Sequence, residues 1–125
     1  MKVVLDAGVF LAVEKQDRRV GAMLRELQRR RVSLATSSAV VAQVWRDGRR
    51  QARVAQLLAG VKVRALAPDE DRRTGELLAI AKTSDVIDAH VVLLAEDEDL
   101  ILTSDARDIE QLVRARRVRA SVVRV

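Results

Sequence analysis

The feature that most constrains this chain is a regular alternation of short apolar runs with longer amphipathic segments. The apolar runs predict buried strands at Lys2–Asp6, Ser33–Thr36, Val61–Leu66, Leu100–Thr103 and Val118–Val125. Strands that alternate with helices pack as a parallel sheet with helices on both faces. The sequence therefore predicts an α/β fold: a three-layer α/β/α sandwich whose central, mostly parallel sheet has about five strands.

The segments between these strands predict helices with recognisable ends. Asp17 and Ser84 are candidate N-caps, and Gly48 and Gly60 are candidate helix breakers. No repeat or low-complexity linker interrupts the pattern, so residues 1–125 are expected to form a single domain. The expected helices are Ala7–Lys15, Asp17–Arg31, Ser38–Arg46, Arg49–Ala59, Asp69–Lys82, Asp85–Glu96 and Asp105–Ala115.

Composition narrows the classes of function. The chain has 23 Lys and Arg against 18 Asp and Glu, a net charge of +5 that favours a polyanionic partner. The base composition of a genome can produce the same excess of Arg, so charge alone does not identify the partner. Phe10 and Trp45 are the only aromatic residues. Nucleic-acid contacts are therefore expected at phosphates, not at stacked bases.

Other features of the sequence indicate the cellular compartment of the protein. The chain has no cysteine, which excludes disulfides and thiolate metal sites. No apolar run approaches the roughly 18–20 residues that a membrane-spanning helix needs. Asp6 comes too early for the apolar core of a secretory signal. We expect a cytoplasmic protein with no membrane partner.

Three aspartates are expected at the carboxyl edge of the sheet, where parallel α/β folds bind ligands. Asp6 ends the first strand and Asp105 follows the strand Leu100–Thr103; both strands are apolar enough to lie centrally, side by side. Asp88 lies three residues after Asp85, on the same face of an apolar helix. Each acid alone can also be read as a helix cap or a charge at a helix N-terminus.

If these carboxylates lie close together, their mutual repulsion must be offset. Each close pair repels by roughly a few kcal/mol at an effective dielectric near 20, so a cation or a shifted protonation is needed. Oxygen ligands suit Mg²⁺ or Mn²⁺, whereas the absence of Cys and the single His disfavour zinc. The sequence has neither G-x-G-x-x-G nor a P-loop, which ranks a nucleotide-binding or phosphoacceptor domain lower.

Four segments, in order along nearly the whole chain, resemble those of PIN domains, the nuclease fold of VapC-type toxins. They are VVLDAGVFLAV, SSAVVAQVW, SDVIDAHVVLLA and LILTSDARDIEQL. The resemblance implies a Mg²⁺- or Mn²⁺-dependent endoribonuclease, the toxin of a toxin–antitoxin pair, with RNA as substrate, an antitoxin as protein partner, and association as a homodimer.

The resemblance also assigns roles to individual residues. Asp6, Asp88 and Asp105 match the metal-binding and catalytic acids of the family, and Asp85 is a further candidate ligand. The residues expected to support these ligands are Gln43, Thr103, Ser104 and Asp108.

Gln43 stands where the family usually has Glu, in a helix that reads as buried. An amide cannot usefully accept a proton at pH 7. Two readings stay open. In the first, catalysis uses the three aspartates and Gln43 only orients a metal-bound water. In the second, the protein is a catalytically weakened or inactive module that binds RNA or a protein. Glu14 and Asp47 are alternative sources of a fourth carboxylate.

An Arg-rich segment, RDGRRQAR, follows the Gln43 helix. If RNA binds, its phosphates are expected at Arg46, Arg49, Arg50 and Arg53. A solvated helix face is the alternative explanation of this segment. A second candidate patch consists of Arg116, Arg117 and Arg119.

Two remaining residues receive structural interpretations. Trp45 is expected to anchor the core or a dimer interface. His90 lies two residues after Asp88, on another face of that helix, and is expected to pack or to face solvent without a role at the site.

Overall fold

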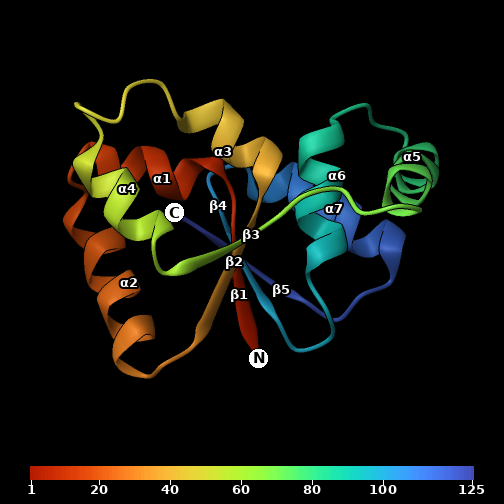
Figure 1. Cartoon of the computed structure of the whole chain (residues 1–125). Coiled ribbons are helices and arrows are strands. Elements are labelled where there is room, and N and C mark those ends of the chain that lie inside the picture. The colour runs from red at the N-terminus through yellow and green to blue at the C-terminus, as the bar shows by residue number, and fades with distance from the viewer.

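The computed structural model describes residues Met1–Val125 and has a five-stranded sheet at its centre (Figure 1). The strand order is β3-β2-β1-β4-β5, and each neighbouring pair is parallel. This confirms the α/β prediction and sharpens it, because the sheet is entirely, not mostly, parallel. The strands are β1 (Lys2–Leu5), β2 (Ser33–Ser37), β3 (Val61–Arg64), β4 (Leu100–Thr103) and β5 (Ser121–Arg124).

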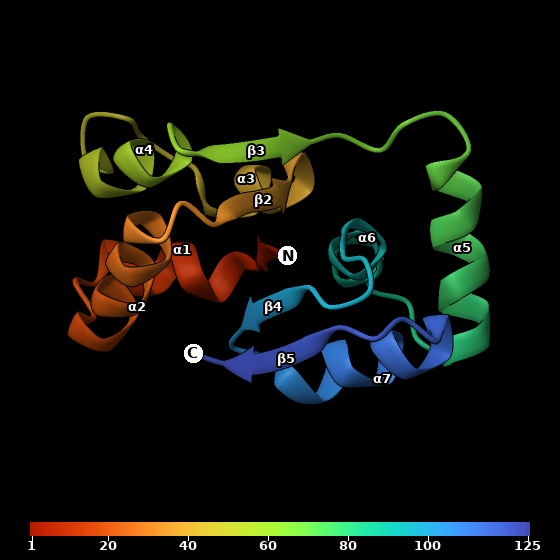
Figure 2. The same cartoon turned by 90° about the horizontal axis from the view of Figure 1, so that it is seen from below.

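Seven helices cover the two faces of the sheet (Figure 1). On one face lie α1 (Ala7–Glu14), α2 (Arg18–Arg29), α3 (Ser38–Val44) and α4 (Ala52–Leu58). On the other lie α5 (Glu70–Ala81), α6 (Val86–Leu94) and α7 (Ala106–Arg116). Figure 2 shows α5 at the outer end of the molecule, where it packs against α6 and α7. None of these helices combines the length and apolar character needed to cross a membrane.

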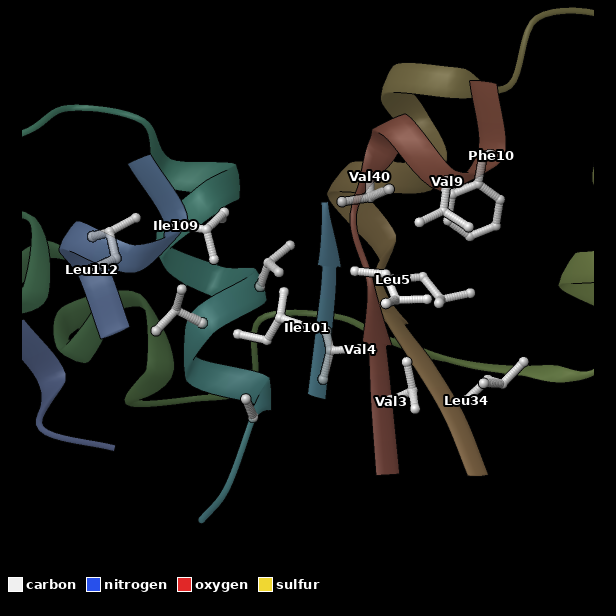
Figure 3. Packing of buried hydrophobic residues seen from close by; sticks show 14 of the residues in the cluster. Val3, Val4, Leu5, Val9, Phe10, Leu34, Val40, Ile101, Ile109 and Leu112 are labelled. Carbon is white, nitrogen blue, oxygen red and sulfur yellow. The ribbon is translucent and has the colours of Figure 1, made fainter. Parts of the chain in front are cut away.

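The core fills both sides of β1. Val3, Val4 and Leu5 are completely buried, as expected of a central strand covered on both faces. Figure 3 shows Phe10 of α1 on one side of this strand and Ile109 of α7 on the other. The central position of β1 follows from its unbroken apolar run, and this position fixes where the strand ends.

The order of the strands changes direction at β1, so the switch point of the sheet lies between the neighbouring strands β1 and β4. The first three strands step outward from β1 to β3, and the chain then returns to place β4 on the other side of β1. The backbone N–H of Asp6 donates to the carbonyl of Leu102 at 3.0 Å, directly beyond the paired strands. Asp6 and the end of β4 therefore lie together at the switch point of the sheet, where ligands of such folds bind.

Several element boundaries differ from the sequence prediction. The helix expected to reach Arg46 ends at Val44, and the next begins at Ala52, not at Arg49. The cause is Gln51, whose side-chain oxygen accepts the N–H groups of Arg46 and Asp47 and so satisfies them outside a helix.

Three predictions at other boundaries were also inexact. The last strand starts at Ser121, three residues later than expected from Val118, and β3 ends at Arg64, short of Leu66. The N-cap of α6 is Asp85, not Ser84, because the Asp85 carboxylate accepts the N–H of Asp88 at 3.0 Å. Asp17 caps α2 as predicted, accepting the N–H of Val20.

Candidate metal centre

Asp6 is held rigidly where β1 passes into α1. The residue is 5% exposed, and its extended backbone conformation makes it the N-cap of α1. One carboxylate oxygen accepts the N–H of Ala7 at 2.8 Å, and the other accepts the hydroxyl of Thr103 at 2.7 Å. Both oxygens thus have protein partners that fix their direction.

Thr103 joins two of the acids. It is the last residue of β4 and is completely buried. Its hydroxyl donates to Asp6 and at the same time accepts the backbone N–H of Asp105 at 2.9 Å. One hydroxyl therefore sets the relative positions of the β1–α1 and β4–α7 turns, which carry Asp6 and Asp105.

Asp88 enters the same region from α6. It lies in the first turn of that helix and is only 8% exposed. Burial is the main cause that raises the pKa of the Asp88 carboxyl from 3.8 to about 7, and neighbouring negative charges add to the effect. These charges are, in decreasing order, those of Asp6, Asp85, Asp105 and Asp108. The structure thus concentrates more negative charge at this point than it neutralises.

The tightest group of carboxylates consists of Asp88, Asp105 and Asp108. One oxygen from each lies within 4.8 Å of the other two. Asp105 precedes α7 and Asp108 lies in its first turn, and both are exposed. Burial, followed by the adjacent Asp108 carboxyl, raises the pKa of Asp105. Asp108, expected only as a supporting residue, is therefore one of the three closest acids, whereas Asp6 lies outside this group.

The donor set fits a hard divalent cation. It contains only carboxylate oxygens, it is open to solvent on the side of Asp105 and Asp108, and its charges repel one another without a cation. Mg²⁺ and Mn²⁺ prefer such ligands and keep several waters when bound. Asp85 is exposed, and its carboxylate caps α6.

Gly8 allows the two acidic turns to approach each other. A Cβ atom at position 8 would lie 2.3 Å from the hydroxyl oxygen of Ser104 and 2.6 Å from its Cβ. No side chain larger than hydrogen fits this contact without movement. Ser104, expected to support the ligands by hydrogen bonding, instead packs against Gly8 and makes no side-chain hydrogen bond.

The structure does not place Gln43 in the apolar environment that its neighbours suggested. Gln43 is exposed near the end of α3, and its side chain makes no hydrogen bond within the chain. The helix buries Val40 and Val44 instead. The two alternative acids are also engaged elsewhere, since Glu14 accepts from Gln51 and Asp47 accepts the N–H of Arg49.

The first arginine group is exposed. Arg46 donates to the carbonyls of Ala42 and Trp45 at the end of α3, and Arg50 lies 3.8 Å from Asp47. Arg49 has no side-chain partner. Arg53, in the first turn of α4, lines a cavity together with residues of α2.

Two residues of the second arginine group, Arg116 and Arg119, have partners within the chain, and Arg117 is exposed. Arg116 is partly buried, and its guanidinium donates to the carbonyls of Val92 and Ala95 at the end of α6. The guanidinium thus satisfies carbonyl groups that have no partner within the helix, and its positive charge favours the negative end of the helix dipole. Arg119 pairs with Asp97 at 3.4 Å and with Glu98 at 3.5 Å.

Two buried polar residues make contacts that the sequence did not predict. Gln51 is 4% exposed and makes four side-chain hydrogen bonds. His90 is 1% exposed; its Nδ1 lies 2.7 Å from the Ser37 hydroxyl and its Nε2 lies 3.2 Å from Glu70. His90 therefore packs, as one of the expected alternatives stated, and links α6 to β2 and α5. Glu14 and both partners of His90 are distant in sequence, whereas Arg46, Asp47 and Val44 are close to Gln51 along the chain.

Comparison with known proteins rests on structure. No protein-family model matches the chain, and no curated protein sequence matches it. A chain in the crystal structure of VapBC2 from Rickettsia felis bound to a DNA fragment from their promoter superimposes with a TM-score of 0.72. The match covers 98% of this chain and 99% of that chain, at 15% sequence identity. The chain therefore has the PIN-like α/β fold.

Proposed function

We propose that this protein is a metal-dependent endoribonuclease that acts as the toxin of a toxin–antitoxin pair. The observation that carries the proposal is the group formed by Asp88, Asp105 and Asp108, whose oxygens lie within 4.8 Å of one another. This group stands beside Asp6 at the switch point of a PIN-like sheet. Such an arrangement of acids suits binding of Mg²⁺ or Mn²⁺ and hydrolysis of phosphodiesters.

The contacts of each acid indicate its role in binding a cation or in facing RNA. A divalent cation bound at the acids would act as a Lewis acid and lower the pKa of a water molecule that attacks the phosphodiester. Asp6, fixed by Thr103, would be a rigid ligand. Asp88 would lose its proton when a cation offsets the surrounding negative charges. Asp105 and Asp108, both exposed, would form the side that faces RNA.

RNA phosphates would bind the exposed arginines after α3. Arg49 and Arg50 are the best candidates, because Arg46 already donates to the carbonyls of Ala42 and Trp45. Exposed guanidinium groups attract phosphates with little sequence preference, and such binding weakens as salt is raised. Recognition by base stacking stays unfavourable in a chain with a single Trp and a single Phe.

A specific observation supports a second candidate function, that of a non-catalytic PIN-like module that binds RNA or a protein. An amide, Gln43, stands where the resemblance implies a carboxylate, and it is exposed and without a hydrogen bond. The site then has only aspartates to bind a cation and to activate water. The module would keep the fold and the arginines but would cleave RNA slowly or not at all.

A cleavage assay distinguishes these functions. Purified protein is incubated with single-stranded and structured RNAs in Mg²⁺ or Mn²⁺, beside the variants Asp6→Asn, Asp105→Asn and Asp108→Asn. The matched control is Glu110→Gln, an exposed acid on α7 that lies outside the acidic group. We expect wild type and Glu110→Gln to cleave and the aspartate variants to lose activity. Equal cleavage by all variants would contradict the assignment of the site.

The same assay tests the alternative. If wild type binds RNA but leaves it intact in either metal, the protein is a binding module. Binding is measured separately with the metal chelated, so that cleavage and binding are not confused.

An antitoxin would have a place to bind on the other helical layer. A cavity of about 460 Å³ lies between α1, α2 and α4, with apolar walls formed by Val13, Leu24 and Leu57. Arg18, Arg25 and Arg53 also line it, which suits an amphipathic acidic segment. We expect Arg25→Glu to weaken the binding of an antitoxin encoded beside this gene, as measured by calorimetry. The rate of RNA cleavage should not change.

A homodimer would use exposed apolar side chains. Ile80 is 65% exposed near the end of α5, and Val86 is 49% exposed at the start of α6. Trp45 is a weaker candidate than the sequence suggested, because it is partly buried and packs against Gly48. Sedimentation of wild type and Ile80→Glu tests this assignment; a monomeric variant beside a dimeric wild type is expected.

A further inference from the structure

Gln51 is a buried amide with a complete set of partners. It is 4% exposed and precedes α4. Its oxygen accepts the N–H groups of Arg46 at 2.7 Å and Asp47 at 3.0 Å. Its nitrogen donates to the carbonyl of Val44 at 2.8 Å and to a carboxylate oxygen of Glu14 at 3.0 Å. All donors and both acceptor positions of the amide are therefore used.

These four bonds fix the segment 46–50, which we call the basic loop. The loop has no helix or strand of its own, so its backbone groups need other partners. Gln51 supplies partners at the start of the loop, and Asp47 accepts the N–H groups of Arg49 and Arg50 further along. The bond to Glu14 ties the whole loop to the end of α1.

A second contact also restricts the loop. A Cβ atom on Gly48 would lie 3.0 Å from the indole ring of Trp45. The ring and the buried amide thus constrain the same few residues. The side chains that point out of this loop are exposed: Arg50 has 88% of its side chain accessible. The loop is therefore polar and exposed, yet several directed contacts reduce the number of conformations that its backbone can adopt.

We propose that Gln51 is a positioning residue for RNA binding: its buried amide holds the basic loop in the shape that presents Arg49 and Arg50 to phosphates. This inference rests on the proposed function. A loop ordered before binding loses less conformational entropy when it binds, so affinity improves without a new contact. Gln51 itself touches no RNA.

The contact between Gln51 and Glu14 offers a charge-neutral test. Gln51→Glu replaces the donor to Glu14 with a second carboxylate and creates a repulsive pair. Adding Glu14→Gln exchanges the amide and the carboxylate, which restores the bond between the two side chains and the original net charge. The bond to the Val44 carbonyl stays lost, because a carboxylate cannot donate. Gln51→Leu removes all four hydrogen bonds. Arg49→Ala reports directly on the phosphate contact.

The experiment measures binding of a fluorescein-labelled single-stranded RNA by anisotropy, with metal chelated, at several NaCl concentrations between roughly 50 and 200 mM. Arg49→Ala, introduced alone, should reduce the magnitude of the slope of log affinity against log salt by about 0.7, the value for one phosphate contact on a single strand. Gln51→Leu and Gln51→Glu should each bind about tenfold more weakly, with a shallower slope. The double variant Glu14→Gln/Gln51→Glu should bind more tightly than Gln51→Glu alone, because it regains the contact with residue 14 and lacks only the bond to the Val44 carbonyl.

Coupling separates positioning from a general loss of stability. In the Gln51→Leu background, Arg49→Ala should cause little further loss, because the loop no longer presents Arg49. Weaker binding with an unchanged slope and full additivity would overturn the proposal, as would unchanged affinity in the Gln51 variants. If Gln51→Leu does not fold, by circular dichroism, the charge-exchange pair decides the question. If wild type itself does not bind RNA, the proposed function and this inference both fail, and that result is visible in the wild-type measurement alone.

Discussion

The hydroxyl of Thr103 donates to the Asp6 carboxylate at 2.7 Å although the two residues are 97 positions apart. The same hydroxyl accepts the N–H of Asp105. Two turns that leave adjacent strands are thereby joined by a single buried oxygen. The acidic site depends on this contact, because it orients one acid and anchors the backbone of another.

Thr103→Val tests that dependence. The substitution preserves shape but leaves an Asp6 oxygen and the Asp105 N–H without their partner, which we expect to cost about 1–3 kcal/mol in the free energy of unfolding. Affinity for Mn²⁺, measured by calorimetry, should also fall. Thr103→Ser should retain both properties. Thr74→Val is a matched control: it removes a buried hydroxyl that donates to the carbonyl of Glu70 within α5, a helix that carries none of these acids, and should leave Mn²⁺ affinity unchanged.

Gly8→Ala should force the two acidic turns apart. The added methyl group would lie 2.3 Å from the Ser104 hydroxyl oxygen, and overpacking of this kind typically costs about 1–3 kcal/mol. Chemical denaturation measures the loss, and Ser104→Gly should recover part of it. Gly75→Ala is the control, since nothing lies within 4 Å of the added atom in α5. That variant should gain about 0.5–1 kcal/mol.

The stability of the metal-free protein should fall as pH rises between about 4 and 7. Burial and neighbouring acids raise the pKa of Asp88 to about 7, so the folded state retains a proton there that the unfolded chain has already lost. If this group acts alone, the free energy of unfolding decreases by about 1.4 kcal/mol per pH unit in that window. Denaturation at a series of pH values, with metal chelated, checks the slope.

Substitution identifies the group responsible. Asp88→Asn cannot ionise, so this variant should lose most of the slope and should be more stable than wild type at pH 8. Asp71→Asn, which removes an exposed acid from α5, should leave the slope as it is in wild type. An unchanged slope in Asp88→Asn would assign the effect to other acids, with Asp105 the next candidate because its pKa is also raised.

Gln43→Glu should tighten binding of Mn²⁺ and increase the rate of RNA cleavage, because it restores the carboxylate that the resemblance implies. Gln56→Glu makes the same chemical change on α4, beside the arginine-lined cavity, and serves as the control for nonspecific attraction of cations. Equal Mn²⁺ affinity in wild type and Gln43→Glu would place this position outside the metal site.

The sequence predicted the fold because the evidence for it is local. Unbroken apolar runs marked β1 and β4 as central strands, and the rule for parallel connections then placed Asp6 beside the end of β4, as the backbone bond between Asp6 and Leu102 confirms. Asp85 and Ser84 are both good capping residues, and only the backbone geometry at the start of α6 decides between them.

The details of the site depend on contacts that no window of sequence contains. Gln43 was read as buried because its neighbours are apolar, yet Gln51, set among charged residues, is the buried amide. Gln51 is buried because the chain returns over the end of α1. There its nitrogen donates to the Glu14 carboxylate and to the carbonyl of Val44. Asp108 was similarly underestimated, because its approach to Asp88 requires α6 and α7 to pack side by side.

The order of the strands also has a consequence for biosynthesis. β4 is made late, yet it must pair with β1, the first strand of the chain, before Asp105 can approach Asp6. A nascent chain can therefore assemble β1, β2 and β3 with their helices while the acids are still separate. If the protein is a nuclease, the emerging polypeptide is inert until β4 and α7 have left the ribosome, so synthesis itself delays the appearance of activity.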